Sequence, residues 1–567
     1  MSEAKPTADL ATCENEPIHA PGAIQPFGVL LALDPNTLTV QHASENNRNV
    51  FGFEAVSPLG LQAAERLGPA AETALRYALV KDGLIDHRPI PISVPGSDVS
   101  RWHGVAHSQG GMVFVELEPA DEAASSPVAL LATVRMSAGR LAAAATISDF
   151  CGTLAREVRS LTGYDRVMVY RFDAEWNGEV VAEERRADLE PFLGLHYPHS
   201  DIPALARALF QVNRIRVIPD ATYEPIPVVP DRDSLTGSPL DLSRCLLRSV
   251  ASVHREYLHN MGVRASLTAS LVIGGQLWGL IACHHLTPRR PGPAEREACD
   301  LLAQIASAHL AILAQAEDRE YLTSLAAVLG RTGKRVGTTT PPIAALAKDP
   351  ADLLALVGAG GAVVWRSGRG MPIGQTPPAR ALPELVRWIK GGAAPLVVTD
   401  RLGQLYPPAK LFTGEASGLL ALEVSRNTEE YLLWFRPEVL QSVNWGGKPD
   451  STPDINGRLS PRRSFALWKE TVRGRSLPWL QAEVENAKRV KDLLVEAASR
   501  SAIQLEAFLP ICAWCKKVRD EPGYWRGVEE FIRDLVDVRF THGVCPECLD
   551  KQMAGFSGHL TAIAQSS

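Results

Sequence analysis

Three arginines in the middle of the chain could bind an anionic ligand. Arg214 and Arg216 flank Ile215, so on a strand their side chains would point the same way. Arg248 follows in a segment that we predict to be a helix, residues 244–261. The planar guanidinium group is the usual bidentate partner of a carboxylate. These arginines are therefore candidates for holding a ligand that carries carboxylates.

Histidines and a tyrosine add hydrogen-bonding capacity to the same region. His254 and Tyr257 are three residues apart and share one face of the predicted helix. His284 and His285 end a predicted strand, so one side chain points inward and the other outward. Such groups would suit a ligand that offers ring N–H groups as well as carboxylates. Any one of these residues alone is more often structural.

An aspartate lies between two prolines just before an amphipathic helix. Asp201 belongs to the run Pro-His-Ser-Asp-Ile-Pro at 198–203, and residues 204–212 have helical periodicity. On the sequence alone, the simplest interpretation is that Asp201 caps the helix N-terminus. The alternative is that it contacts a ligand.

The cysteines fall into three groups. Cys151, Cys245, Cys283 and Cys299 lie in apolar or helical contexts typical of small core residues. Cys13 instead lies in a polar N-terminal arm with little core to bury it. It is either a reactive thiol or simply an exposed residue.

Two Cys-x-x-Cys pairs near the C-terminus, Cys512 with Cys515 and Cys545 with Cys548, have the spacing of tetrahedral zinc knuckles. The spacer is longer than in common zinc ribbons and contains a predicted helix, 529–536; His542 could replace one cysteine. We favour structural zinc over redox-active dithiols and free thiols.

The composition is that of a folded, water-soluble protein. The chain has 567 residues, of which 46% are hydrophobic and 22% charged, and a net charge of −6. No basic stripe supports nucleic-acid binding. No run of about 18 apolar residues indicates a membrane span, and the N-terminus lacks the apolar core of a secretory signal. We expect a cytoplasmic protein of several domains.

The periodicity predicts three α+β modules. Strands are expected at 28–33, 39–42, 90–94 and 111–118 around a helix at 63–80, with a linker at 118–127. A second module has helices at 147–162, 204–212 and 244–261 and strands at 166–172, 179–184, 265–273 and 276–284. A long helix from 295 to 329 leads to a third, with strands at 362–365, 419–424 and 431–435. Residues 441–475 form a long excursion, and 480–505 a helix suited to dimer formation.

Several long motifs resemble the bacterial phytochromes. PHSDIPALAR (198–207), LRSVASVHREYLHNMGV (247–263) and SLVIGGQLWGLIACHH (270–285) are similar to their chromophore domain. CENEPIHAPGAIQPFGVLLAL (13–33) resembles the N-terminal arm and first strand of that subfamily. The match runs from about residue 10 to 500 in one order, so chance similarity is excluded.

The resemblance implies an α+β multidomain fold in which PAS, GAF and PHY domains, built of antiparallel sheets with helices, are joined by long helices and followed by a small Cys-rich module. The expected parts are an arm at 1–22, PAS at 23–120, GAF at 135–316, PHY at 320–480 with a tongue at about 435–478, a connecting dimer helix at 480–506, a zinc-binding CxxC module at 508–552 and a tail at 553–567. The arm near Ile24 would pass through the Pro/Asp-rich loop at 219–238 as a knot.

The resemblance also implies that biliverdin is bonded through Cys13 to an A-ring vinyl group. Asp201 would lie near the pyrrole nitrogens, followed by Ile202 and Pro203. His254 would hold a pyrrole water, and His284 the D-ring carbonyl. The remaining expected contacts are Tyr170, Tyr197 and Tyr257 around the D ring and Arg216, Arg248, Ser266 and Thr268 at the propionates. Phe210 and Ala251 depart from the family, which often has Tyr and Ser there, so one propionate would be held mainly by arginine.

The tongue is implied to be the switch. Trp445-Gly446-Gly447 and Pro461-Arg462-Arg463-Ser464-Phe465 resemble its two halves. Arg462 would pair with Asp201 in the dark state, and the tongue would change from strand to helix after photoisomerisation. The sequence suits both forms, since 464–474 could be a helix while Gly446-Gly447 favours a hairpin. Without the resemblance, Arg462 would be a solvated loop charge.

No enzymatic output is expected. The roughly 60 residues after 505 are too few for an ATPase domain, and they show neither a phospho-acceptor helix nor an ATP lid. We expect a photosensor that acts as a homodimer on a separate histidine kinase or response regulator. The alternatives are a light-regulated enzyme or redox sensor that uses the C-terminal cysteines, and a GAF protein that binds another small ligand.

Overall fold

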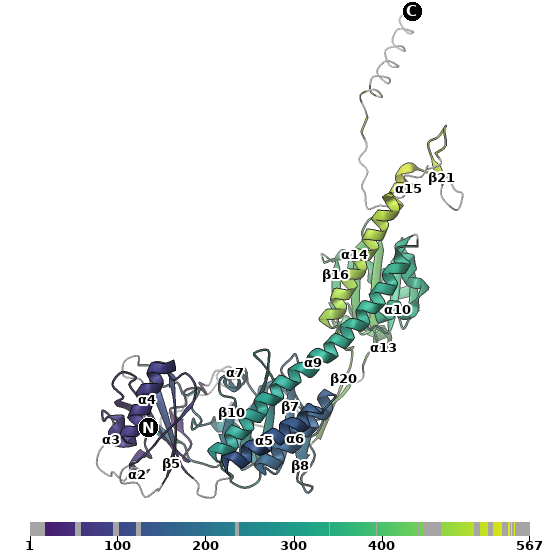
Figure 1. The fold of residues 1–567 in the computed structure, drawn as a ribbon. Coiled ribbons are helices and arrows are strands. Elements are labelled where there is room, and N and C mark those ends of the chain that lie inside the picture. Colours follow the sequence, from purple (N-terminus) through teal and green to yellow (C-terminus); the bar gives the residue numbers. More distant parts are fainter. Residues whose placement is uncertain are drawn as a thin grey trace, which may run out of the picture. The chain divides into compact units, whose positions relative to one another are not determined.

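The computed structural model describes residues 17–549, apart from 51–57, 95–100, 121–125, 233–236, 340, 393, 440, 447–466, 504–510, 520–524, 536–542, 545 and 547–548. The chain divides into two compact units (Figure 1). The first unit contains residues 1–317 and 442–470, and the second contains residues 318–441 and 471–567.

The first sheet of unit one has seven strands in the order β1-β11-β3-β2-β6-β5-β4. Its strands are β1 (Ala23–Ile24), β2 (Val29–Leu33), β3 (Val40–Ser44), β4 (Arg88–Ile90), β5 (Trp102–Gln109), β6 (Met112–Pro119) and β11 (Ile226–Val229), and its helices are α2 (Asn47–Val50), α3 (Ala63–Leu67) and α4 (Pro69–Asp82). The single helix predicted at 63–80 is two helices, because Pro69 starts α4 at its first turn and Gly68 between them has a φ of 88°. Leu31, Leu67 and Leu75 are fully buried between these helices and the sheet.

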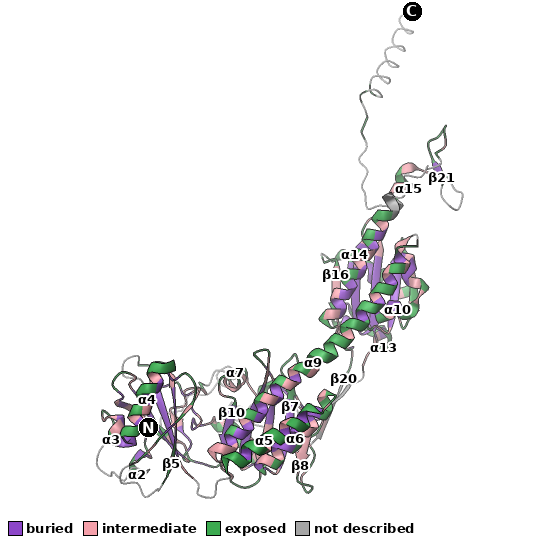
Figure 2. Ribbon diagram, in the orientation of Figure 1, coloured by how far each residue is buried: buried purple, intermediate pink, exposed green. Residues whose placement is uncertain are grey.

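The second sheet of unit one has eight strands in the order β10-β12-β13-β7-β8-β9-β19-β20. Its strands are β7 (Arg166–Phe172), β8 (Gly178–Arg185), β9 (His196–Tyr197), β10 (Ile215–Ile218), β12 (Ala265–Ile273), β13 (Gln276–His285), β19 (Gln441–Gly446) and β20 (Leu467–Val472). The associated helices are α5 (Pro127–Ala142), α6 (Ile147–Thr162), the 3₁₀ turn η1 (His199–Asp201), α7 (Ala204–Val212), α8 (Ser252–Asn260) and α9 (Pro293–Val336). Helices α5, α6 and α9 pack on one face of this sheet (Figures 1 and 2).

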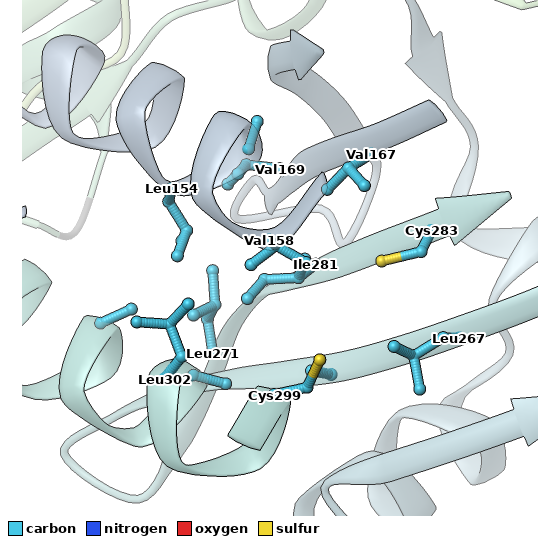
Figure 3. Packing of buried hydrophobic residues seen from close by; sticks show 14 of the residues in the cluster. Leu154, Val158, Val167, Val169, Leu267, Leu271, Ile281, Cys283, Cys299 and Leu302 are labelled. Atoms are coloured by element: carbon cyan, nitrogen blue, oxygen red, sulfur yellow. The ribbon is translucent and has the colours of Figure 1, made fainter. Parts of the chain in front are cut away.

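Side chains along each strand alternate between the two faces of the sheet, and the apolar ones lie on the face that the helices cover. Val167 and Val169 of β7, Leu267 of β12 and Ile281 of β13 are buried against Leu302 of α9 and its neighbours (Figure 3). Because successive strand residues point to opposite faces, the residues between them lie on the other face. The sheet therefore has one dry apolar face and one face left for other partners. Cys151, Cys283 and Cys299 are buried in this core and Cys245 in another cluster, which confirms their prediction as core residues.

The N-terminal arm lies between two stretches of one loop of the second module. On one side Ala23 and Ile24 pair with Pro227 and Ile226 of β11. On the other side Ser249 N donates to Ala23 O at 3.0 Å, and Gln25 N donates to Leu247 O at 2.7 Å. This is the arrangement expected for an arm that passes through the Pro/Asp-rich loop.

The predicted helix 244–261 is wrong in its first half. Only Ser252–Asn260 is helical, and residues before it run extended, with Arg248 bridging to Ile24. Backbone groups that a helix would use are instead bonded to the arm, so tertiary pairing overrides the local preference.

Helix α5 lies just after the predicted linker and was not expected from the sequence. Among the described helices, α9 alone is long and apolar enough to cross a membrane by length and composition. Leu302, Ala306 and Leu310 of α9 are fully buried in the core, as in a long core helix.

Unit two contains a sheet of five strands in the order β15-β14-β18-β17-β16. Its elements are η2 (Pro342–Lys348), α10 (Pro350–Ala355), β14 (Gly361–Arg366), β15 (Arg369–Gly374), η3 (Ala379–Ala381), α11 (Leu382–Gly391), β16 (Leu396–Thr399), α12 (Leu402–Leu405), η4 (Pro407–Phe412), α13 (Thr413–Ala416), β17 (Gly418–Ser425), β18 (Glu430–Arg436) and α14 (Gln481–Ile503), followed by the hairpin β21 (Val518–Arg519) and β22 (Trp525–Arg526) and by α15 (Val528–Leu535). A buried ion pair, Arg436 Nη2 to Glu483 Oε1 at 2.6 Å, ties the sheet to α14, and Tyr321 of α9 donates to the same carboxylate.

Candidate functional site

The polar residues predicted from the sequence gather on the second face of the eight-stranded sheet. Arg216 of β10 lies opposite Thr268 of β12, and Ser266 of β12 lies opposite His284 of β13. Directly paired residues in antiparallel strands share a face, and residues two apart on one strand do so too. These four side chains therefore form one patch, opposite to the apolar core.

Two buried guanidinium groups stand without carboxylates. Arg216 is 8% exposed and Arg248 is 6% exposed. Arg216 donates from Nη1 to Leu246 O at 3.1 Å and from Nη2 to Arg248 O, while Arg248 donates to Ile18 O. Within the described part of the chain, neither guanidinium has a carboxylate within ion-pair distance. Desolvation, followed by the charge of Arg248, lowers the pKa of Arg216 to about 9.

This pair of arginines is a physical argument for an anionic ligand. A buried charge without an opposite charge is costly, and backbone carbonyls compensate it only in part. A ligand with two carboxylates would supply the missing charge. Arg214, in contrast, does not join the patch as predicted. It lies before β10 begins, its Nε is 3.4 Å from Asp300 Oδ1, and nearly half of its side chain is exposed.

The two histidines are reached by water and are also desolvated by surrounding protein atoms. His254 has exposed surface and His284 is half-buried, yet desolvation lowers the pKa of His254 to about 4 and that of His284 to about 3. His284 Nδ1 is a buried atom without a hydrogen-bond partner, which suits a ligand acceptor or donor at that position. Both imidazoles are neutral at pH 7.

Helix α8 and the turn η1 are joined at Asp201. Tyr257 Oη donates to Asp201 Oδ2 at 3.2 Å, and the rings of Tyr257 and His254 stack with centroids 6.1 Å apart. The predicted shared face of His254 and Tyr257 is confirmed. The prediction that Asp201 caps α7 is wrong, because Pro203 occupies the cap position and no side chain caps the helix. The Asp201 side chain is therefore directed toward Tyr257 of α8 and not toward the N-terminus of α7.

Two tyrosines pack beside the turn that carries Asp201. Tyr170 of β7 and Tyr197 of β9 lie with ring centroids 6.0 Å apart, and Ile202 packs against their cluster. Helix α7 carries Leu205, Leu209 and Phe210, yet none of its nine residues is buried. An amphipathic helix normally buries its apolar side. Here that side is only partly covered in the described part of the chain, since Phe210 packs against the cluster of Tyr170 and Tyr197 while Leu205 is exposed.

The excursion of the chain reaches this site as strands. Trp445 of β19 pairs in parallel with His196 of β9, and the two rings meet edge to face with centroids 6.1 Å apart. A Cβ on Gly446 would lie 2.7 Å from the Tyr197 ring, so a larger residue requires the ring or the strand to shift. Residues 467–472 form strand β20, where a helix over 464–474 was considered possible from the sequence.

Sequence reasoning missed two buried residues that position the arginines. Gln25 donates from Nε2 to Val217 O at 3.0 Å, beside Arg216. Glu116 of β6 accepts from Leu246 N at 3.1 Å and from Leu247 N at 2.6 Å, just before Arg248. Each is a polar residue inside an apolar run. This pattern indicates that the side chain is buried and hydrogen-bonded, but it does not identify the partner.

Several predicted residues lie outside the described part of the chain: Cys13, Arg462, Ser464, His542, Cys545 and Cys548. Of the predicted metal ligands, Cys512 and Cys515 are described. They lie in one turn before β21, and Cys515 N donates to Cys512 Sγ at 3.5 Å.

Comparison with known families agrees with this geometry. The PAS fold family matches residues 13–120, the GAF domain family residues 146–313 and the phytochrome region family residues 328–503. A bacteriophytochrome from Xanthomonas campestris is 35% identical over 92% of this chain and 83% of its own. The chain belongs to the phytochrome family. Cyanobacterial phytochrome B from Nostoc is 39% identical over 88% of this chain and 67% of its own length.

Solved phytochrome structures share the fold. The bacteriophytochrome from the photosynthetic bacterium R. palustris has a TM-score of 0.76 and 36% identity, and covers 88% of this chain and all of its own. The photosensory core module of the Stigmatella aurantiaca phytochrome has a TM-score of 0.74 and 40% identity over 87% of this chain. The predicted PAS, GAF and PHY fold class is thereby confirmed. Membership of this photoreceptor family implies a bilin chromophore, and the patch of arginines, histidines and tyrosines suits one.

Proposed function

We propose that the protein is a red/far-red photoreceptor that binds biliverdin covalently through Cys13. The observation that carries this proposal is the pair of buried arginines, Arg216 and Arg248, without carboxylates in the described part of the chain. Biliverdin carries two propionates and a flat row of pyrrole rings. Its charge and shape match the arginines, the neutral histidines and the partly covered apolar side of α7.

The positions of the described side chains support the roles that the resemblance implies. Arg216 and Arg248 clamp the propionates, with Ser266 and Thr268 beside them on β12. The backbone carbonyl of Asp201 accepts from pyrrole N–H groups, while Ile202 and Pro203 hold the turn in place. His254 holds a pyrrole water, and His284 donates to the D-ring carbonyl. Tyr170, Tyr197 and Tyr257 surround the D ring. The Cys13 thiol adds across the A-ring vinyl group, which needs no oxidant or reductant.

The signal is proposed to leave the site through the excursion at about 435–478. Bound biliverdin supplies a light-driven isomerisation of a double bond. The protein responds through Asp201, which we propose pairs with Arg462 near Ser464 in the dark state. Support comes from β19, which lies against Tyr197 at Gly446. A strand that contacts the ring environment this closely must move when that environment changes shape.

The output is proposed to be a separate histidine kinase or response regulator, reached by a homodimer. Leu301 and Ile312, which share a face of α9, are exposed and support helix pairing. The turn that joins Cys512 and Cys515 supports the zinc proposal for the C-terminal module, with Cys545, Cys548 and His542 as the further ligands. A redox sensor built on the same cysteines is the alternative. A metal-free protein that keeps its fold and four reactive thiols would favour that alternative.

The decisive experiment is an absorption spectrum of biliverdin-loaded protein before and after red light. We expect a red band that converts to a far-red band and back. Cys13→Ala should still bind biliverdin, but denaturation should release the pigment. Failure of the wild-type protein to form a red band would overturn the proposal and favour a different small ligand.

The signalling role of Asp201 has its own test. Asp201→Ala should keep biliverdin bound but lose the far-red photoproduct, because the excursion is no longer held by a carboxylate. Asp201→Asn, which keeps the shape, is the matched variant. Normal formation of the far-red photoproduct in Asp201→Ala would remove the proposed role.

A further inference from the structure

Three side chains of metal-binding type lie together on the seven-stranded sheet, away from the bilin patch. They are His87, just before β4, His107 of β5 and Glu116 of β6. One nitrogen or oxygen atom of each lies within 4.8 Å of those of the other two. His107 and Glu116 are buried, and His87 is exposed. The group thus has a dry interior and one side open to water.

One short loop, residues 244–247, orients all three side chains. His87 Nε2 lies 2.9 Å from Arg244 O, and His107 Nε2 lies 3.8 Å from the sulfur of Cys245. The next two backbone N–H groups donate to the Glu116 carboxylate, as described above. Histidines that bind a metal almost always donate their other ring N–H to a carbonyl or similar acceptor. In that tautomer, both histidines offer the lone pair of Nδ1.

The arrangement leaves a nitrogen without a partner. His107 Nδ1 is buried and has no hydrogen bond. It lies 4.0 Å from Glu116 Oε1. Two atoms that bind one zinc ion at about 2.0–2.2 Å with tetrahedral geometry lie about 3.3–3.6 Å apart. A shift of roughly half an ångström would therefore place both atoms in the coordination shell.

Charged groups of both signs lie near the cluster, with Arg244 as a cation beside the two histidines. Burial lowers the pKa of His107 to about 2 and raises that of Glu116 to about 7. His107 offers a neutral nitrogen, and no arginine or lysine of the described part of the chain lies within ion-pair distance of Glu116, since the nearby Arg296 is bonded to Glu118 at 3.0 Å. The nearby Arg244 extends toward the exposed Asp86, with 4.0 Å between Nη2 and Oδ1. Cys245 stays a protonated thiol, since burial raises its pKa well above the usual range.

We propose that His87, His107 and Glu116 bind one divalent transition-metal ion, with zinc the best match to two imidazoles and a carboxylate. Cys245 is a hydrogen-bond partner of His107 and not a ligand. The bound ion fixes the loop 244–247, which continues directly into Arg248. The site therefore braces the segment that presents one of the two buried arginines to the bilin. The metal site itself stands independently of the proposed function.

Zinc binding is tested on the full-length, untagged chain carrying Cys512→Ser and Cys515→Ser, which removes half of the other predicted zinc ligands. Equilibrium dialysis with zinc should give one ion per chain, and X-ray absorption should show nitrogen and oxygen ligands near 2.0–2.2 Å, without sulfur. His87→Ala and Glu116→Gln should weaken binding at least tenfold. His103→Ala, an exposed histidine on the same strand β5, is the matched control and should bind zinc normally.

Either of two results overturns the proposal. One is a chain that retains no zinc in this background, which would make the cluster a metal-free hydrogen-bonded group. The other is equal zinc affinity in His87→Ala and His103→Ala. Circular dichroism without metal checks the folding of each variant, and His87→Ala decides the matter if Glu116→Gln does not fold. Each measurement is made with and without biliverdin, so that failure of the bilin proposal is seen separately.

Discussion

The two faces of the eight-stranded sheet are built from alternate residues of the same strands and differ in character, one apolar and the other polar. On β12 and β13, Leu267 and Ile281 enter a dry core, while Ser266 and His284 face the other way (Figure 3). The core face is complete in itself, with its residues almost fully buried. Among the described residues, the other face carries a guanidinium with no carboxylate within ion-pair distance, a buried nitrogen with no hydrogen-bond partner and a helix that is only partly covered. One face is thus built for packing while the other offers polar groups to a ligand, so changes on the two faces should separate stability from binding.

The largest effect is expected on the core face. Leu271→Ala removes a fully buried side chain and should lower the free energy of unfolding by about 2–5 kcal/mol, through lost burial and the cavity left behind. The bilin absorption maximum of the folded variant should stay unchanged, because Leu271 points away from the site. Urea unfolding measures the change in the free energy of unfolding, and the absorption spectrum measures the bilin absorption maximum. A shifted maximum without loss of stability would contradict the separation of the two faces.

For Arg216→Met on the site face, we expect the main effect on biliverdin binding and not on stability. The substitution removes a buried cation without a carboxylate but also leaves Leu246 O and Arg248 O without this donor, so the bilin-free protein should lose less stability than it does with Leu271→Ala. Biliverdin affinity should fall about tenfold to a hundredfold, in line with the loss of a charge-assisted pair. Arg214→Met, two residues earlier and exposed, is the control and should bind normally. Biliverdin dimethyl ester, which has no propionate charge, should bind the wild type and Arg216→Met equally; an unequal result would assign Arg216 a different role.

The sequence predicted regular elements well wherever local periodicity and tertiary packing agree. Helices α6 and α7 and strands β7 and β12 have the predicted bounds, because each alternates or repeats against one partner. Residues 244–251 failed because their backbone is bonded to the arm, a contact distant in sequence. Glu116 shows, for a single site residue, that contacts between residues distant in sequence cannot be predicted from the sequence. A glutamate inside an apolar strand is visible in the sequence, but the loop it braces lies more than a hundred residues away.

A smaller effect is expected where β19 adjoins the site face. Gly446→Ala would place a Cβ 2.7 Å from the Tyr197 ring, so β19 must shift. Because the strand lies near the sheet edge and the ring can adjust, the cost should be about 1–2 kcal/mol. Hydrogen exchange should accelerate for the amides of β19 and β9, while the core strands keep their protection. Gly139→Ala, on helix α5 with nothing within 4 Å, is the control. Unchanged exchange in β19 would mean that the strand is not held by this contact.

The smallest effect is a pH dependence that distinguishes the faces without any ligand. Burial holds the pKa of His284 at about 3, below its ordinary value of about 6.5. Below pH 6.5 the unfolded chain takes up a proton that the folded chain refuses, so stability falls as the pH falls toward 3. His284→Gln should lessen this loss by at most about 1 kcal/mol at pH 5.5, because water reaches part of the ring.

Urea unfolding of the bilin-free protein at pH 7.5 and pH 5.5 measures this effect. His107 and His254 shift the stability with the same sign in both proteins, so only the difference between wild type and His284→Gln reports on His284. Because the core face between the same strands carries no titrating histidine among its buried residues, Leu271→Ala should leave the pH dependence unaltered while lowering stability at both pH values. An equal pH dependence in wild type and His284→Gln would mean that the site face is as open to protons as bulk water, and that this face does not desolvate a ligand.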